Sequence, residues 1–229
     1  MKILAIGDIF GETGRQIIKN YLPHLKEKHQ IGLTVANVEN STHGKGISYK
    51  HYQELKSYGI DIMTSGNHIF HREETQQFIQ EVSDLLRPLN SNPYHPGPGT
   101  ILIEVKNKKI RITNLLGTAF MPIAAENPYF TLEKLLEKED CDIHLIDFHA
   151  ETTAEKNALA LHFDGKISMT GPYGGVIGAK PTAIIQRAKQ GLPAKMVPYE
   201  DKGQFNGILL EIDNTSNKVI KIERLRKIF

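Results

Sequence analysis

Short apolar runs alternate with amphipathic stretches along the first part of the chain. The apolar runs have the length of buried strands and end in glycine or polar residues; they are residues 2–7, 33–38 and 60–64. Residues 12–29 and 48–58 place apolar side chains at helical spacing, and Ser48 suits the N-cap of the second helix. The pattern predicts a βαβαβ unit, which requires a parallel sheet covered by helices. The fold class is therefore α/β.

The remainder of the chain is predicted to hold one more strand, two more helices and two hairpins. The strand is residues 142–148, and the helices are residues 73–86 and 153–162. The hairpins are residues 101–105 with 110–115, around 107–109, and residues 207–212 with 218–224, around 213–215. Composition does not shift along the chain, so residues 1–229 are predicted to form one domain.

Composition narrows the classes of protein. With 40% hydrophobic and 24% charged residues, the chain resembles an ordinary globular protein. A net charge of +2 is too small to predict stable nucleic-acid binding. Cys141 is the single cysteine, which fits a reducing compartment. No apolar stretch is long enough to cross a bilayer, so we expect no membrane partner and a cytoplasmic location.

Polar side chains follow the predicted strands where each strand ends. Asp8 follows the first strand, Glu39 and Asn40 the second, and Asn67 and His68 the third. Ligands of parallel sheets bind outside the carboxyl ends of the strands, so these side chains are predicted to lie at one edge. The strand at 142–148 ends in the same way, at His149. Carboxylates, amides and imidazoles are ligands for Zn, Mn or Fe, and a carboxylate such as Glu39 can bridge two ions.

The glycines after the first strand offer an alternative. Gly7, Gly11 and Gly14, with Glu39 after the second strand, imitate a dinucleotide-binding fingerprint. The spacing is G-x-x-x-G-x-x-G rather than G-x-G-x-x-G, and Asp8 would place a carboxylate against the pyrophosphate. Both the glycine spacing and the carboxylate of Asp8 therefore disfavour a dinucleotide site, and the metal site remains the preferred interpretation.

Five ordered motifs resemble the YmdB family of metallophosphoesterases, within the calcineurin-like superfamily. They are GDIFGETGR (7–15), VENSTHGKGI (38–47), SGNHIF (65–70), DFHAETTAEK (147–156) and MTGPYGGVIG (169–178). The resemblance implies a metallophosphoesterase α/β sandwich with a two-metal site. For both ions it favours Fe or Mn over Zn. It also implies small-molecule phosphodiester substrates, cyclic nucleotides in particular, and self-association as a homo-oligomer.

The resemblance also implies roles for single residues. Asp8 resembles a ligand of the first metal, and Glu39 the bridging carboxylate, with Asn40 beside them. Asn67 and His149 resemble ligands of the second metal. His68 resembles the residue that faces the substrate, where an imidazole can protonate the departing oxygen.

The chain departs from the family pattern at two places. The pattern has a Gly-Thr-His-Thr-His segment and a further strand where Ser168 here joins Met169 directly, so two metal-ligating histidines are missing and the second site is weakened. His43 and His71 are the candidates to replace them. In addition, Thr118 stands where the family has an arginine, which would alter phosphate contacts.

Three function classes therefore remain open. The first is a metal-dependent phosphodiesterase that uses water attack, with His68 as general acid. The second is a degenerate member that binds a nucleotide or acts in regulation. The third is the dinucleotide enzyme, which the glycine spacing disfavours.

Overall fold

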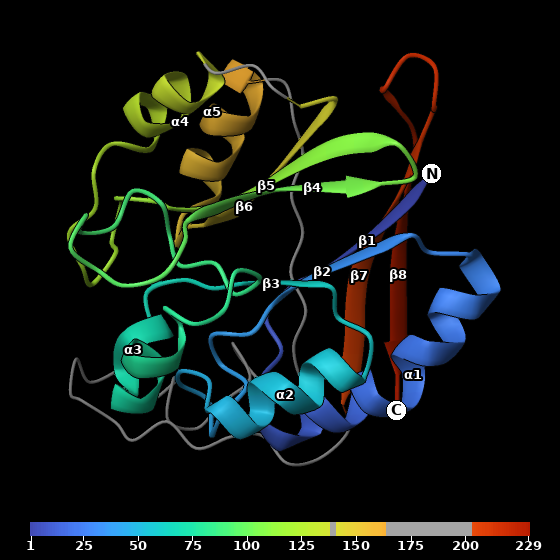
Figure 1. Ribbon diagram of the computed structural model, residues 1–229, viewed down its shortest axis with the longest axis horizontal. Coiled ribbons are helices and arrows are strands. Elements are labelled where there is room, and N and C mark those ends of the chain that lie inside the picture. Colours follow the sequence, from blue (N-terminus) through green and yellow to red (C-terminus); the bar gives the residue numbers. More distant parts are fainter. Residues whose placement is uncertain (138–140, 164–202) are drawn as a thin grey trace.

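Two β-sheets packed face to face form the centre of the molecule, and helices cover their outer sides (Figure 1). The computed structural model describes residues 1–137, 141–163 and 203–229. In Figure 1 the helices α1, α2 and α3 lie along one side of the strands, and α4 and α5 lie on the opposite side. The arrangement is an α/β/β/α sandwich, as the sequence predicts.

The larger sheet has five strands in the order β3-β2-β1-β7-β8. Its members are β1 (Lys2–Ile6), β2 (Leu33–Asn37), β3 (Ile62–Thr64), β7 (Gln204–Ile212) and β8 (Val219–Ile228). The pairs β1–β2 and β2–β3 are parallel, which confirms the predicted βαβαβ unit. The C-terminal hairpin of β7 and β8 extends this sheet, with β7 antiparallel to β1.

The smaller sheet has three strands in the order β4-β5-β6. They are β4 (Thr100–Val105), β5 (Lys108–Leu116) and β6 (Ile143–His149), with β4 antiparallel and β6 parallel to β5. The hairpin turn falls at Lys106 and Asn107, both with positive φ, one residue earlier than predicted. Two left-handed residues are what a tight two-residue hairpin requires, since their twist matches that of the strands.

Three apolar clusters hold the layers together. One lies between the larger sheet and its helices α1 (Gly11–His29), α2 (Tyr49–Ser57) and α3 (Glu73–Phe78), which a short 3₁₀ turn, η1 (Ile69–His71), precedes. The second joins the two sheets through buried residues such as Ile3, Val35 and Ile112. The third lies between the smaller sheet and α4 (Pro128–Leu136) and α5 (Thr153–Phe163). The sequence pattern did not predict α4.

The helix predicted over residues 73–86 is wrong in its second half. The helix α3 ends at Phe78, and the chain then returns to the edge of the larger sheet. Leu85 forms a parallel bridge with Met63, whose amide donates to Asp84 O at 2.7 Å and whose carbonyl accepts from Leu86 N at 2.8 Å. The exposed edge of β3 thus gains backbone partners that a continued helix would leave unpaired.

Ser48 caps α2 as predicted. Its Oγ accepts a hydrogen bond from His51 N at 3.2 Å, which satisfies one of the free amides of the first turn. We expect Ser48→Ala to lower the free energy of unfolding by about 1 kcal/mol, measured by denaturant titration. The control is Ser57→Ala in the exposed last turn of the same helix, with an expected change within ~0.5 kcal/mol. Equal losses in both variants would contradict the capping role.

Three further predictions concern a membrane span, the junction of Ser168 with Met169 and the number of domains. Among the described residues, no helix has both the length and the apolar surface needed to cross a membrane. The junction of Ser168 with Met169 lies outside the described residues, and so does the last of the five motifs. The organisation of residues 1–229 as one domain stays a prediction.

Candidate metal centre

Four strand ends from the two sheets meet at one place. Asp8 follows β1, Glu39 follows β2, and His149 ends β6 in the other sheet. Each of these three residues offers one ligand atom, and the three atoms lie within 4.8 Å of one another. Asn67, after β3, joins them, since its Oδ1 lies 3.1 Å from His149 Nε2. The structure therefore brings Asp8, Glu39 and Asn67 together as the strand-end rule predicts, and His149 joins them from the other sheet.

Glu39 is the most buried member of this cluster, with 1% of its surface exposed. Its Oε2 accepts from His68 N at 2.8 Å, and its Oε1 lies 3.2 Å from His149 Nε2. Burial raises the pKa of Glu39 to about 7, and the neighbouring Asp8 carboxylate adds to the rise. Burial also raises the pKa of Asp8. Two carboxylates held together away from water are an unfavourable arrangement unless a cation neutralises them.

His149 shares a charge environment with these carboxylates. Burial alone lowers its pKa, but the carboxylates of Glu39, Asp8 and Asp147 outweigh burial, so the pKa of His149 is raised. In the metal-free protein the carboxylates therefore favour the protonated form of this imidazole. A metal ion would supply the positive charge instead, with the neutral imidazole as a ligand.

Asn40 connects the carboxylates to His68. Its Nδ2 donates to Asp8 Oδ2 at 3.1 Å and lies 3.4 Å from Glu39 Oε1. Because the amide nitrogen faces the carboxylates, its Oδ1 faces His68 Nδ1 at 2.8 Å and accepts the Nδ1 proton. This contact leaves Nε2 of the neutral imidazole without a proton. Burial, followed by the charge of Lys45, lowers the pKa of His68 to about 4, so the ring is neutral near pH 7.

Gly66 gives the cluster its close packing. A Cβ added at this position would lie 2.5 Å from Glu39 Oε2 and 2.5 Å from His149 Cδ2. Any side chain at residue 66 would therefore occupy space that the two ligand groups need. Glycine is therefore required at residue 66 for steric reasons. A glycine at the end of a strand often marks such a close approach of other groups.

Asp147 is a member of the site that sequence reasoning missed. It precedes His149 by two residues on β6, and side chains two apart on a strand share a face. Its Oδ2 accepts from Thr64 Oγ1 and, at 3.2 Å, from Asn37 Nδ2. Asn37 Oδ1 accepts in turn from Glu39 N at 3.2 Å. These hydrogen bonds tie the two sheets together directly beneath the cluster, and the period of two in D-F-H was the signal that could have found Asp147.

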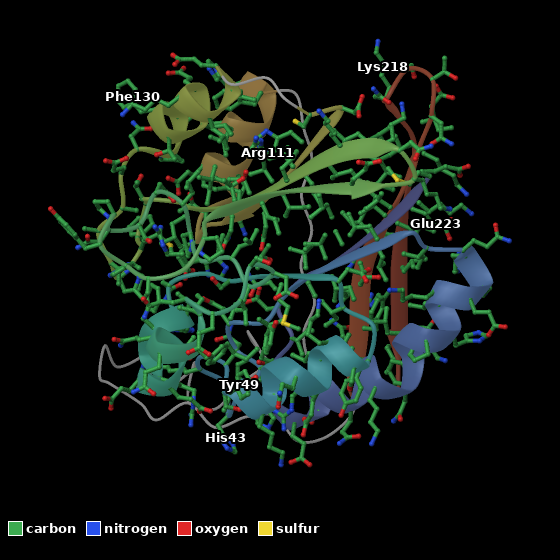
Figure 2. All side chains as sticks on the ribbon, in the orientation of Figure 1. His43, Tyr49, Arg111, Phe130, Lys218 and Glu223 are labelled. Atoms are coloured by element: carbon green, nitrogen blue, oxygen red, sulfur yellow. The ribbon has the colours of Figure 1, made fainter. Side chains whose placement is uncertain are left out.

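The two histidines considered as replacements do not join the cluster. His43 is exposed, has a φ of 53°, and lies at the periphery of the molecule (Figure 2). His71 is also exposed, and its ring centre lies 6.3 Å from that of His68. Among the described residues, the group able to hold a metal consists of Asp8, Glu39 and His149.

A cavity of about 760 Å³ opens over the cluster. One wall comes from the loops after β1, β2 and β3, with Phe10, Lys45 and His68. The opposite wall comes from the loop after β5, with Phe120 and Pro122, and from the region after β6, with Glu151 and Lys156. The cavity has room for a small organic molecule.

Comparison with known proteins shows which family the chain belongs to. The model of the YmdB-like protein family matches residues 4–169 and 167–225. The chain belongs to the YmdB-like family. The two matched stretches meet at residues 167–169, where the sequence predicts a missing segment.

Two relatives illustrate how closely the chain matches other proteins. A 2',3'-cyclic-nucleotide 2'-phosphodiesterase of Bacillus subtilis strain 168 is 34% identical over 255 residues, which cover 98% of this chain and 96% of the relative. That alignment is longer than the 229 residues of the chain, so part of the relative has no counterpart here. The crystal structure of a novel phosphatase of Mycoplasma pneumoniae is 40% identical, with a TM-score of 0.92 over 100% of this chain and 93% of that one.

A more distant structure shows how widely this fold is shared. The calcineurin-like phosphoesterase YfkN of Bacillus subtilis is 12% identical, with a TM-score of 0.58 over 99% of this chain and 90% of that one. At this identity the likeness concerns the fold alone. The YmdB-like chain therefore has the mixed α/β architecture, with two sheets, of the calcineurin-like phosphoesterases.

The donor set fits a metal ion, since two carboxylates and an imidazole surround one point and the amide of Asn67 lies beside them. The neighbouring Gly66 leaves this space free of any side chain. For a second ion the shell is incomplete among the described residues. All ten histidines lie within them, and His149 alone joins the group of ligands.

Proposed function

We propose that this protein is a metal-dependent phosphodiesterase and that cyclic nucleotides are its substrate class. The observation that carries the proposal is the cluster of Asp8, Glu39 and His149 at the base of a cavity of about 760 Å³. Buried carboxylates with raised pKa values are costly to maintain, and they concentrate at functional sites. The name of the Bacillus subtilis relative supports 2',3'-cyclic nucleotides in particular.

In this proposal Asp8, Glu39, Asn67 and His149 hold the metal, with Glu39 placed to bridge two ions. Fe and Mn suit this mixture of oxygen and imidazole ligands, and Zn is compatible with it. Bound ions would supply Lewis-acid polarisation of the phosphate and activation of a water molecule. Asn40 acts through hydrogen bonds, because it orients both the carboxylates and His68.

His68 is the proposed general acid. Asn40 accepts the Nδ1 proton, so Nε2 is the atom available to the substrate. An anionic phosphate close to the imidazole favours its protonated form, which raises the pKa of His68 from its low value in the free protein. The ring then takes a proton at Nε2 and passes it to the departing oxygen.

The alternative is a degenerate family member that binds a nucleotide or acts in regulation. It predicts that the protein folds but hydrolyses little or no substrate. Retention of Asp8, Glu39, Asn67, His68 and His149 in one arrangement favours the enzyme instead. Water molecules or residues outside the described ranges would have to complete the second metal shell. The dinucleotide interpretation loses support because carboxylates occupy the place of the pyrophosphate.

The test uses purified protein supplied with Mn²⁺ or Fe²⁺, with metal content measured after dialysis and hydrolysis of a phosphodiester measured in parallel. We expect retained metal and turnover, and a loss of about 10²–10⁴-fold in His68→Ala for an alkyl leaving group. The loss should be smaller for a p-nitrophenyl ester, whose leaving group needs no proton. His24→Ala is the matched control, since that exposed imidazole lies on α1, outside the cluster. Absence of both metal and turnover would exclude the enzyme.

A further inference from the structure

Phe120 is unusual among the aromatic residues around the cavity. It lies in the loop after β5 and lines the cavity, yet 88% of its surface is exposed. Its backbone has a φ of 59°, in the left-handed region that side chains other than Asn and Asp rarely adopt. An aromatic ring held in water on a strained backbone receives no stabilisation from the core, and such strain concentrates at binding sites.

The other phenylalanines that line the cavity are engaged elsewhere. The Phe10 ring packs against Gly44, where an added Cβ would lie 2.8 Å from the ring. Phe148 is buried in the cluster between the smaller sheet and its helices. Phe120 therefore presents the largest free aromatic surface to a molecule in the cavity.

The backbone just before Phe120 is held by β6 and by α5. Gly117 N donates to His149 O at 2.9 Å, which ties the start of the loop to the strand that delivers a metal ligand. The Glu155 carboxylate of α5 accepts from Thr118 N at 2.7 Å, from Thr118 Oγ1 at 2.9 Å, and from Ala119 N at 3.3 Å. Because this backbone is already fixed, a ligand that contacts the ring does not have to order the segment before it, which favours affinity.

We propose that Phe120 is a specificity-determining residue that stacks on the base of a nucleotide whose phosphate lies at the metal cluster. The inference rests on the proposed function and names the residue that would recognise the base of such a substrate. The cavity supplies the two chemistries that such a ligand needs. Lys45 and Lys156 provide positive charge around the site, and Phe120 with Pro122 provides an apolar wall on one side. Stacking on an aromatic ring accepts every base, because each base has a π-face.

The experiment compares substrates with and without a base. The variant Phe120→Ala is assayed with Mn²⁺ on 2',3'-cyclic AMP and on glycerol 1,2-cyclic phosphate, and equilibrium binding is measured for 3'-AMP and glycerol 2-phosphate. We expect the ratio of kcat/KM for the nucleotide to that for the base-free ester to fall tenfold or more, through KM. The ratio of the two binding constants should fall by a similar factor.

Two further variants separate stacking from folding. Phe120→Gly removes the ring and tolerates the left-handed backbone, so it should reproduce the loss of selectivity with a thermal midpoint no lower than that of Phe120→Ala. Phe130→Ala is the matched control, because this phenylalanine is 63% exposed on α4 and does not line the cavity (Figure 2).

The outcomes distinguish this inference from the proposed function. Equal losses for the nucleotide and the base-free compound, or no loss for either, would overturn the stacking role. Turnover of neither ester by the wild-type protein would contradict the proposed function alone, since the binding measurement would still decide the role of Phe120.

Discussion

Glu39→Gln is expected to abolish metal retention and phosphodiester hydrolysis while the metal-free protein becomes more stable at pH 8. Glu39 is proposed to bridge the metal ions, and even the loss of groups that only support a ligand weakens metal affinity by ~10–100-fold. We therefore expect a fall of at least about 100-fold in affinity for Mn²⁺. The glutamine keeps one oxygen for His68 N and loses only the contact with Asn40 Nδ2, which is long at 3.4 Å, so the lost hydrogen bond offsets little of the gain in stability.

The gain in stability follows from the sign of the pKa shift. The pKa of Glu39 is raised to about 7 by burial, above its ordinary value of 4.5. Above pH 7 the folded protein holds an ionised group that the unfolded chain solvates better, and each unit of pKa difference corresponds to about 1.4 kcal/mol. The neutral glutamine removes this cost, so its advantage should be present at pH 8 and should fade as the pH falls toward 5, where wild-type Glu39 takes up its proton.

Three measurements check this pair of effects. They are metal content after dialysis, turnover of 2',3'-cyclic AMP, and denaturant unfolding at pH 8 and pH 5 with a chelator present. The exposed Glu81 supplies the control, and Glu81→Gln should match the wild type in all three. The assignment fails if Glu39→Gln keeps its metal, or if its metal-free form is less stable than the wild type at both pH values.

The sequence predicts where the strand-end residues gather, because the rule that places them depends only on topology. Three apolar runs separated by amphipathic helices predict parallel neighbours, and Asp8, Glu39 and Asn67 then share an edge whatever the details of packing. His149 is a harder case, because β6 belongs to the other sheet. Its position depends on how the two sheets pack, which residue periodicity does not encode. The motifs around it supplied that information.

The features that the sequence did not predict depend on contacts between residues that are distant in the chain, which topology alone does not determine. The helical pattern continues past Phe78, but the backbone of β3 gains more from pairing with residues 84–86 than the helix gains from another turn. The period of two in D-F-H places Asp147 on the same face as His149, but its hydrogen-bond partners, Thr64 and Asn37, lie on strands of the other sheet and are set by packing. The role of Asn40 between the carboxylates and His68 likewise depends on which way its amide faces.

Gly66→Ala should damage the site almost as severely as removal of a ligand, although it adds a single methyl group. The added Cβ would lie 2.5 Å from Glu39 Oε2 and 2.5 Å from His149 Cδ2, distances at which atoms must move. Glu39 cannot move freely, because His68 N and Asn40 Nδ2 hold its two oxygens and the residue is buried. Overpacking of this kind costs about 1–3 kcal/mol of stability.

The larger effect of Gly66→Ala is on geometry, because the carboxylate and the imidazole are forced apart just where both would face the proposed metal. We expect Mn²⁺ affinity and kcat/KM to fall by about 100-fold or more, measured by metal titration and by turnover of 2',3'-cyclic AMP. The matched control is Gly32→Ala, since its Cβ would meet nothing closer than 3.6 Å. That variant should stay within ~0.5 kcal/mol of the wild type and keep its metal. Wild-type affinity in Gly66→Ala would mean that the metal lies away from Glu39 and His149, because no ion held by both could tolerate their displacement.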